Sequence, residues 1–178
     1  EIYDMIVSLS ANLRYTIKGG ELVRLQEELD YVDRYILLQK TRLGGRLEVT
    51  KKINPKVNLA VIPKISIQML VENAIIHGMP ENGAVLHIII RVCMENNRLL
   101  ISVYDDGKGI LPEKVKELND IFSGKSADTG NSIGLPNLAS RLKILYQGEA
   151  GLFLESQGDQ FTEVKMELPI RKRENENV

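Results

Sequence analysis

Cysteine, histidine and net charge are all scarce in this chain of 178 residues. Cys93 is the single cysteine, which excludes an internal disulfide and a cysteine-based zinc site. The two histidines, His77 and His87, are too few for a multi-histidine metal centre. Lysine plus arginine number 23 and aspartate plus glutamate 24, so the formal net charge is -1. This near-neutrality argues against a nucleic-acid partner but leaves room for one small anion site.

Long hydrophobic runs are missing as well. The apolar stretch at 85–90 is far shorter than the roughly 20 residues that a membrane helix needs. Hydrophobic residues make up 43% and charged residues 26% of the chain, which is typical of a folded globular protein. No signal peptide opens the sequence, and it begins inside a helical pattern. We therefore expect one domain with a short extension, a cytoplasmic piece of something longer.

Residues 1–46 carry the apolar spacing of two helices that are separated at Gly19-Gly20. Steps of three and four residues define a narrow apolar seam on each helix, formed by Ile2, Ile6, Leu9, Leu13, Leu22, Leu25, Leu29, Val32 and Ile36. The acidic residues Glu27 and Glu28 fall outside this seam. Such a seam can be buried against the neighbouring domain or in a helical bundle shared by two chains, and we favour the shared bundle.

Beyond residue 46 the pattern changes to short strands and amphipathic helices. We expect helices at 64–78, 112–121 and 135–146, and a polar loop at 123–131. The expected strands are 47–50, 57–61, 86–94, 99–104, 151–156 and 162–168, with a hairpin joining the third and fourth. This order predicts an α+β fold with helices on one face of a mixed sheet. The predicted domains are 1–46 (helical), 47–170 (catalytic) and 171–178 (a charged tail).

Three segments could carry chemistry, and the first is the helix at 64–78. One helical face gathers Ile67, Leu70, Val71 and Ala74 and should face the sheet, and another gathers Met69, Glu72, Asn73 and Ile76. The amide oxygen of Asn73 is a hard ligand that suits Mg²⁺, which usually keeps waters and bridges phosphates. The alternative is that Glu72 and Asn73 are only solvated, and this segment by itself favours that alternative.

The second and third segments are glycine-containing loops. A strand runs into Asp105-Asp106-Gly107-Lys108-Gly109, where Asp105 could accept a hydrogen bond from the exocyclic amino group of adenine and the glycines could let a base approach. The loop at 130–137 leads directly into a helix, whose N-terminus attracts phosphate. The alternatives are an ordinary turn and an ordinary capped loop.

Taken together and in this order, the segments resemble the nucleotide-binding boxes of the GHKL ATP-binding superfamily. LVENAIIHG resembles its N box, DDGKG its G1 box and GNSIGLPNLASRL its G2 box. The sensor histidine kinases of the LytS/YesM type are the most similar family. LSANLRY, EELDYVDRYILLQKTR, IPKISIQMLVENAIIHG, IGLPNLASRLKILYQG and TEVKMELP all look like that family, so the resemblance covers nearly the whole chain.

The resemblance implies a two-layer α/β sandwich that binds ATP and Mg²⁺. Asn73 would coordinate the Mg²⁺, Asp105 would accept the adenine amino group, and the remaining ATP-binding residues would be His77, Gly107, Gly109, Ser132, Gly134, Leu135 and Asn137. The family also implies a homodimer through the N-terminal helices, a response regulator as partner, and a membrane-anchored sensor of which this is the cytoplasmic part.

The chain departs from the family pattern at several positions. Ser132 replaces the usual first lid glycine, Asp106 replaces a frequent asparagine, and Ile76 replaces a basic residue. Neither His77 nor His87 has the surroundings of the phosphoacceptor histidine, so we expect the acceptor upstream of this chain and read His87 as a structural residue.

These departures leave two alternative functions open. One is an ATP-hydrolysing enzyme, which is disfavoured because Met69 occupies the position of the catalytic base in the hydrolytic branch and a thioether cannot take a proton from water. Glu72 is a weaker candidate base. The other is a degenerate nucleotide-binding module that serves as a dimeric scaffold, for which Ser132 and Ile76 leave room.

Overall fold

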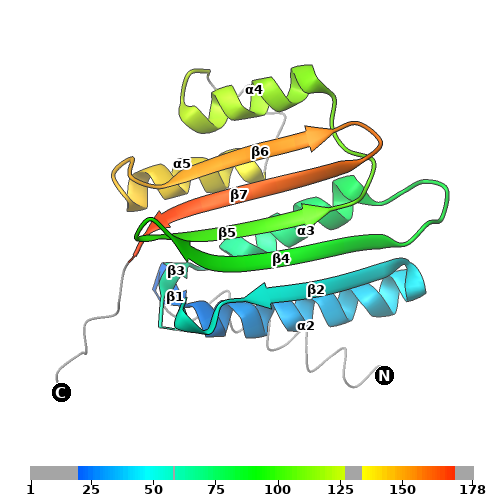
Figure 1. The fold of residues 1–178 in the computed structure, drawn as a ribbon, viewed down its shortest axis with the longest axis horizontal. Helices are drawn as coiled ribbons and strands as arrows, with labels where there is room; N and C mark the ends of the chain where they lie inside the picture. The colour runs from blue at the N-terminus through cyan, green and yellow to red at the C-terminus, as the bar shows by residue number, and fades with distance from the viewer. Residues whose placement is uncertain (1–19, 58, 127–133, 171–178) are drawn as a thin grey trace.

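The computed structural model describes residues 20–57, 59–126 and 134–170 (Figure 1). The expected first helix, Ser132 and the tail at 171–178 therefore lie outside the described residues. Within the described part, no helix has both the length and the apolar character that crossing a membrane requires.

The centre of the fold is a mixed sheet of five strands in the order β2-β4-β5-β7-β6. The strands are β2 (Leu47–Ile53), β4 (Leu86–Glu95), β5 (Arg98–Asp105), β6 (Gly151–Gln157) and β7 (Phe161–Pro169). Only the β2–β4 pair is parallel; the other three pairs are antiparallel. Asn96 and Asn97 both have positive φ and form the two-residue turn that joins β4 to β5, as the predicted hairpin requires.

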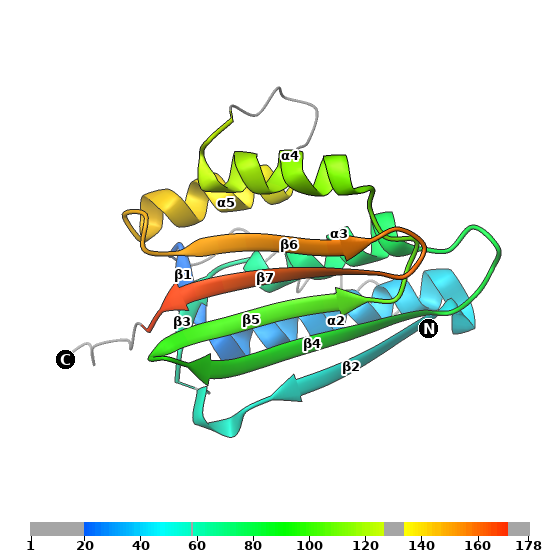
Figure 2. The same cartoon turned by 45° about the horizontal axis from the view of Figure 1, so that its top comes forward.

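Helices cover one face of this sheet, which gives two layers (Figure 1). They are α2 (Leu25–Leu43), α3 (Ser66–Gly78) and α5 (Leu135–Leu145), while α4 (Pro112–Ser123) lies along the edge strand β6 (Figure 2). Every second residue of β4 and β7 is buried toward the helices. The α+β fold with a mixed sheet and helices on one face is confirmed.

The seam of α2 is buried inside this chain, which corrects our preference for a bundle shared by two chains at this helix. Leu25, Leu29, Val32 and Ile36 all belong to the hydrophobic core that α3 and the sheet form. Glu28 and Tyr31 of α2 are buried as well, so the buried face of the helix is wider than its apolar seam. The shared-bundle hypothesis is thereby restricted to residues 1–19.

Two further expectations are wrong in detail. Leu22–Arg24 forms the short strand β1, paired antiparallel with β3 (Val61–Pro63), and not the first turn of a helix. The expected strand at 57–61 is replaced by a 3-10 turn at Pro55–Val57, with only Val61 in β3. Proline restricts its own φ and lacks an N–H, so Pro55 favours a turn over a ladder position.

Candidate functional site

Asp105 is a buried carboxyl group at the C-terminal end of β5. Only 2% of it is exposed, and it lies opposite Thr162 of β7 in the strand register. Burial raises the pKa of Asp105 from 3.8 to about 7, and the charge of Asp106 adds to this increase. A hydrogen bond from the Gly107 N–H to Oδ1, at 3.0 Å, acts in the opposite direction. An acceptor held in an apolar setting is well suited to recognise one donor group on a ligand.

The loop after Asp105 is fixed by its own glycines. A Cβ at Gly107 would overlap the carbonyl oxygen of Gly78, and a Cβ at Gly109, which has φ of 63°, would overlap the carbonyl of Gln157. The N–H of Lys108 donates to the Gly78 carbonyl at 3.2 Å. These glycines therefore let the loop pack closely against the end of α3 and the end of β6, in addition to any contact with a ligand.

Helix α3 brings the first predicted segment to the same place. A Cβ at Gly78, the last residue of α3, would come within 2.6 Å of Asp105 Oδ1, so the end of the helix abuts the carboxyl group. Asn73 is half-buried and His77 is exposed, one turn apart on this helix. The predicted sheet-facing side is confirmed, since its four residues are 0–3% exposed. The end of the helix that carries Asn73 therefore contacts the loop that follows Asp105.

Glu72 lies within electrostatic reach of Tyr31 and Tyr35 on α2. Burial raises the pKa of Tyr35 to about 12, and the negative charge of Glu72 is the next cause. The pKa of Tyr31 is raised by burial and by Glu28 and Glu72. Asn73 follows about 100° further around the helix, so the two polar residues have different surroundings.

The third predicted segment is described from Gly134 onward. Gly134 is the N-cap of α5, and no side chain caps that helix among the described residues. Leu135 is buried and Asn137 is exposed in the first turn. The N-terminus of a helix favours an anion through its backbone N–H groups and its dipole. Helix α5 runs opposite to α3 and beside it (Figure 1).

Sequence reasoning missed the hydroxyl groups that support the loop. The Ser156 hydroxyl accepts from the Ile110 N–H at 2.8 Å, donates to the Phe161 carbonyl at 2.6 Å and lies 3.0 Å from the Thr162 hydroxyl. The alternation of apolar and polar residues along β7 could have revealed Thr162, because it places this residue on the buried face. Thr162 is also the register partner of Asp105.

His87 has a structural role, as its strand position indicated. Its backbone N–H donates to Asp106 Oδ1 at 2.7 Å, its Nδ1 lies 2.8 Å from Asp106 Oδ2, and its carbonyl accepts from the Asp106 N–H. These contacts tie Asp106 to β4 at the start of the loop.

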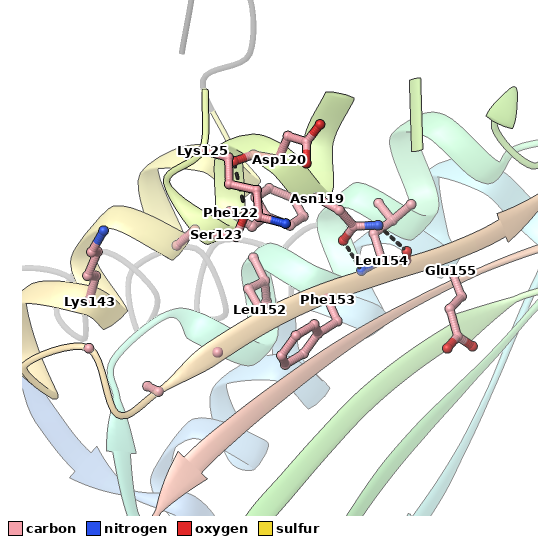
Figure 3. A pocket seen from close by; sticks show the side chains of 14 residues that line it. Asn119, Asp120, Phe122, Ser123, Lys125, Lys143, Leu152, Phe153, Leu154 and Glu155 are labelled. Atoms are coloured by element: carbon pink, nitrogen blue, oxygen red, sulfur yellow. Dashed lines mark hydrogen bonds between the residues drawn. The ribbon is translucent and has the colours of Figure 1, made fainter. Parts of the chain in front are cut away.

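A separate cavity of about 530 Å³ lies where α4 and α5 meet the edge strand β6 (Figure 3). Lys125, Lys143, Phe122 and Leu152 are among its lining residues, and none of the predicted site residues lines it. In its wall, the Asn119 side-chain amide accepts from the Leu154 N–H at 2.9 Å and donates to the Leu154 carbonyl at 2.8 Å (Figure 3). Asn119 thereby attaches α4 to the sheet edge.

Comparisons with known proteins agree with this geometry. Residues 63–172 match the family described as histidine kinase-, DNA gyrase B-, and HSP90-like ATPase. Residues 1–47 match a second family, described as histidine kinase.

Similar sequences are sensor proteins of bacteria. The chain is 28% identical over 176 residues to the sensor protein LytS of Bacillus anthracis, covering 98% of this chain and 30% of that protein. It is 38% identical over 146 residues to the sensor histidine kinase YpdA of Escherichia coli, covering 80% of this chain and 24% of that protein. The chain thus spans less than a third of the length of these relatives.

Similar solved structures support the fold. The catalytic domain of histidine kinase ThkA has a TM-score of 0.58 at 18% identity, covering 85% of this chain and 96% of that domain. A blue-light activated histidine kinase domain from Erythrobacter litoralis has a TM-score of 0.54 at 20% identity, covering 94% of this chain and 74% of that one.

Proposed function

The chain belongs to the histidine kinase-, DNA gyrase B-, and HSP90-like ATPase family, and we propose that it is the part of a sensor histidine kinase that binds ATP and supplies its γ-phosphate. The acceptor would be a histidine upstream of this chain, from which the phosphoryl group passes to a response regulator. We place the intact protein in a bacterial membrane as a homodimer, with this part in the cytoplasm.

The buried carboxyl group of Asp105 is the observation that carries this proposal. It is a buried acceptor at the end of a strand, and the backbone of Gly78 at the end of α3 approaches it closely. The exocyclic amino group of adenine is a donor that fits it, whereas guanine has a carbonyl at that position. Gly107 and Gly109 would then border the base, and His77 would lie near the nucleotide.

The phosphates would lie toward the N-terminus of α5, where Gly134, Leu135, Asn137 and the preceding Ser132 would contact them. The Asn73 oxygen would hold Mg²⁺ together with waters and phosphate oxygens, as this cation prefers. Among the described residues no three His, Cys, Asp or Glu side chains cluster as a metal site, so phosphates and waters must complete the shell. Bound there, Mg²⁺ would offset the phosphate charge during transfer.

Hydrolysis of ATP as the main activity is disfavoured by the surroundings of α3. Met69 has no basic atom at the position of the hydrolytic base, and the charge of Glu72 acts on the tyrosines of α2. We expect a purified chain with ATP and Mg²⁺ to release almost no phosphate in a coupled assay. Steady release of phosphate would favour the ATPase alternative.

Calorimetric titration with ATP and Mg²⁺ tests the proposal, with GTP as the competing nucleotide. We expect binding of ATP without binding of GTP, and an affinity lower by on the order of tenfold in Asp105→Asn. Asp30→Asn, on an exposed part of α2, is the matched control and should bind as the unaltered chain does. A folded chain that binds neither nucleotide would contradict the proposal and favour the scaffold.

A further inference from the structure

Glu28 is a fully buried carboxylate on α2 that serves a different helix. Its Oε2 accepts from the Ile65 N–H at 2.8 Å, and its Oε1 accepts from the N–H groups of Ile67 and Gln68 at 3.0 and 3.3 Å. These three donors form the start of α3. The N-terminal amides of a helix need acceptors, and here α2 supplies them from 37 to 40 residues away.

Within the part of the chain that the structure describes, no side chain near the start of α3 replaces this acceptor. Its N-cap is Ile65, whose side chain cannot accept a hydrogen bond, and the Ser66 hydroxyl donates to the Pro63 carbonyl at 2.6 Å. Ile65 also has φ of 65°, which is unfavourable for a β-branched residue. Such a backbone persists where neighbouring contacts hold it, and Glu28 bonds its N–H directly.

The same turn is also tied to the helix that follows the 127–133 segment. The guanidinium group of Arg141 on α5 donates to the Lys64 carbonyl at 2.6 Å. Burial lowers the pKa of Arg141, and the charges of Glu28 and Glu21 oppose that change, so Glu28 and Arg141 lie within electrostatic reach. Three elements, α2, α3 and α5, therefore meet at residues 64–68.

We propose that Glu28 is a positioning residue for the nucleotide site, coupling α2 to the helix that carries Asn73. This role rests on the proposed ATP-binding function of α3. Helices α2 and α3 start at the same end of the molecule and run in the same direction (Figure 1). A displacement of α2 that withdrew Glu28 would break three hydrogen bonds to the start of α3 and deprive those amides of their charged acceptor, so we expect α3 to follow α2.

Glu28→Gln in the full 178-residue chain is the test, with Glu27→Gln on the exposed side of the same turn as control. We expect Glu28→Gln to remain folded, with amides 67–73 exchanging on the order of tenfold faster in hydrogen–deuterium exchange. We also expect a Kd for ATP raised by about fivefold, the lower end of typical coupling between sites. A merely stabilising role would lower the Tm but leave this Kd unchanged well below the Tm.

Two results would overturn the proposal. One is exchange in α3 that matches the Glu27→Gln chain, and the other is faster exchange with an unchanged Kd for ATP. If Glu28→Gln does not fold, Glu28→Asp, which keeps the charge on a shorter side chain, is judged by the same two measurements. An unaltered chain that does not bind ATP contradicts the proposed function instead, and exchange alone then decides whether Glu28 couples α2 to α3.

Discussion

A single carboxyl group, Asp105, combines two properties that rarely coexist at a surface turn. It ends strand β5 and lies two residues before Gly107, in a sequence typical of a turn, yet it is almost completely buried. Burial penalises its charged form and raises its pKa to about 7. The group therefore carries part of the pH dependence of folding as well as the proposed recognition of adenine.

We expect this pKa to make the protein less stable as the pH rises from about 4 to about 7. In that interval the unfolded chain has lost the Asp105 proton while the folded chain keeps it, so deprotonation favours unfolding. The two pKa values, 3.8 and about 7, correspond to a change of up to about 4 kcal/mol. Urea unfolding at pH 4.5 to 8 measures it. In Asp105→Asn the free energy of unfolding should no longer fall with pH in this way, and in Asp30→Asn it should fall as in the unaltered chain. An equal pH dependence in all three chains would contradict the raised pKa of Asp105.

Gly107→Ala should destabilise the protein by about 2 kcal/mol or more. The new methyl group would overlap the Gly78 carbonyl, so the loop and the end of α3 would have to move apart. Gly45→Ala is the control, since nothing lies within 4 Å of a Cβ there and its φ is ordinary. Chemical denaturation compares the two. Equal stabilities would mean that the loop can move away from α3 without cost.

Single residues differ in how well the sequence predicts them. The place of Asp105 at a strand end, with its glycines in the following loop, could be predicted because neighbours in the sequence are also neighbours in the loop. The role of these residues in binding stays a prediction. Glu28 falls outside the apolar seam, as Glu27 does, and nothing in the spacing indicates that it is 0% exposed. Its acceptor role depends on amides 37 to 40 residues away, and helical spacing carries no information about such partners.

At the scale of elements, α2 belongs to the folded domain although its sequence reads as part of a bundle. A fragment that starts at residue 44 should therefore fail to unfold cooperatively, while residues 20–178 should do so. Burial of each of Leu25, Leu29, Val32 and Ile36 contributes about 1.5–3 kcal/mol, and together they rival the stability of a typical domain. Thermal unfolding followed by circular dichroism compares the fragments. An equal Tm for both would restore a boundary at residue 46.

Short elements were the ones that pattern reasoning misassigned. Leu22 and Leu25 have helical spacing, but Leu22–Arg24 pairs antiparallel with Val61–Pro63. The Lys64 N–H adds a hydrogen bond to the Glu21 carbonyl at 2.9 Å. In a segment of three residues, the apolar alternation of a strand, which repeats every 2 residues, cannot be told from that of a helix, which repeats every 3.6. The long hairpin and α3 were predicted closely, since their patterns repeat several times.

At the scale of the whole molecule, the proposed dimer now depends on residues 1–19. The seam of α2 is occupied within the chain, which leaves Ile2, Ile6, Leu9 and Leu13 as the apolar residues available for a second copy. Sedimentation of the full chain should show a concentration-dependent dimer, and residues 20–178 should sediment as a monomer. Ile6→Asp and Leu13→Asp in the full chain should also give a monomer, because a charge in a shared seam is desolvated. If the full chain is as monomeric as residues 20–178, two copies of residues 1–19 do not associate by themselves. Dimerisation would then require the longer protein.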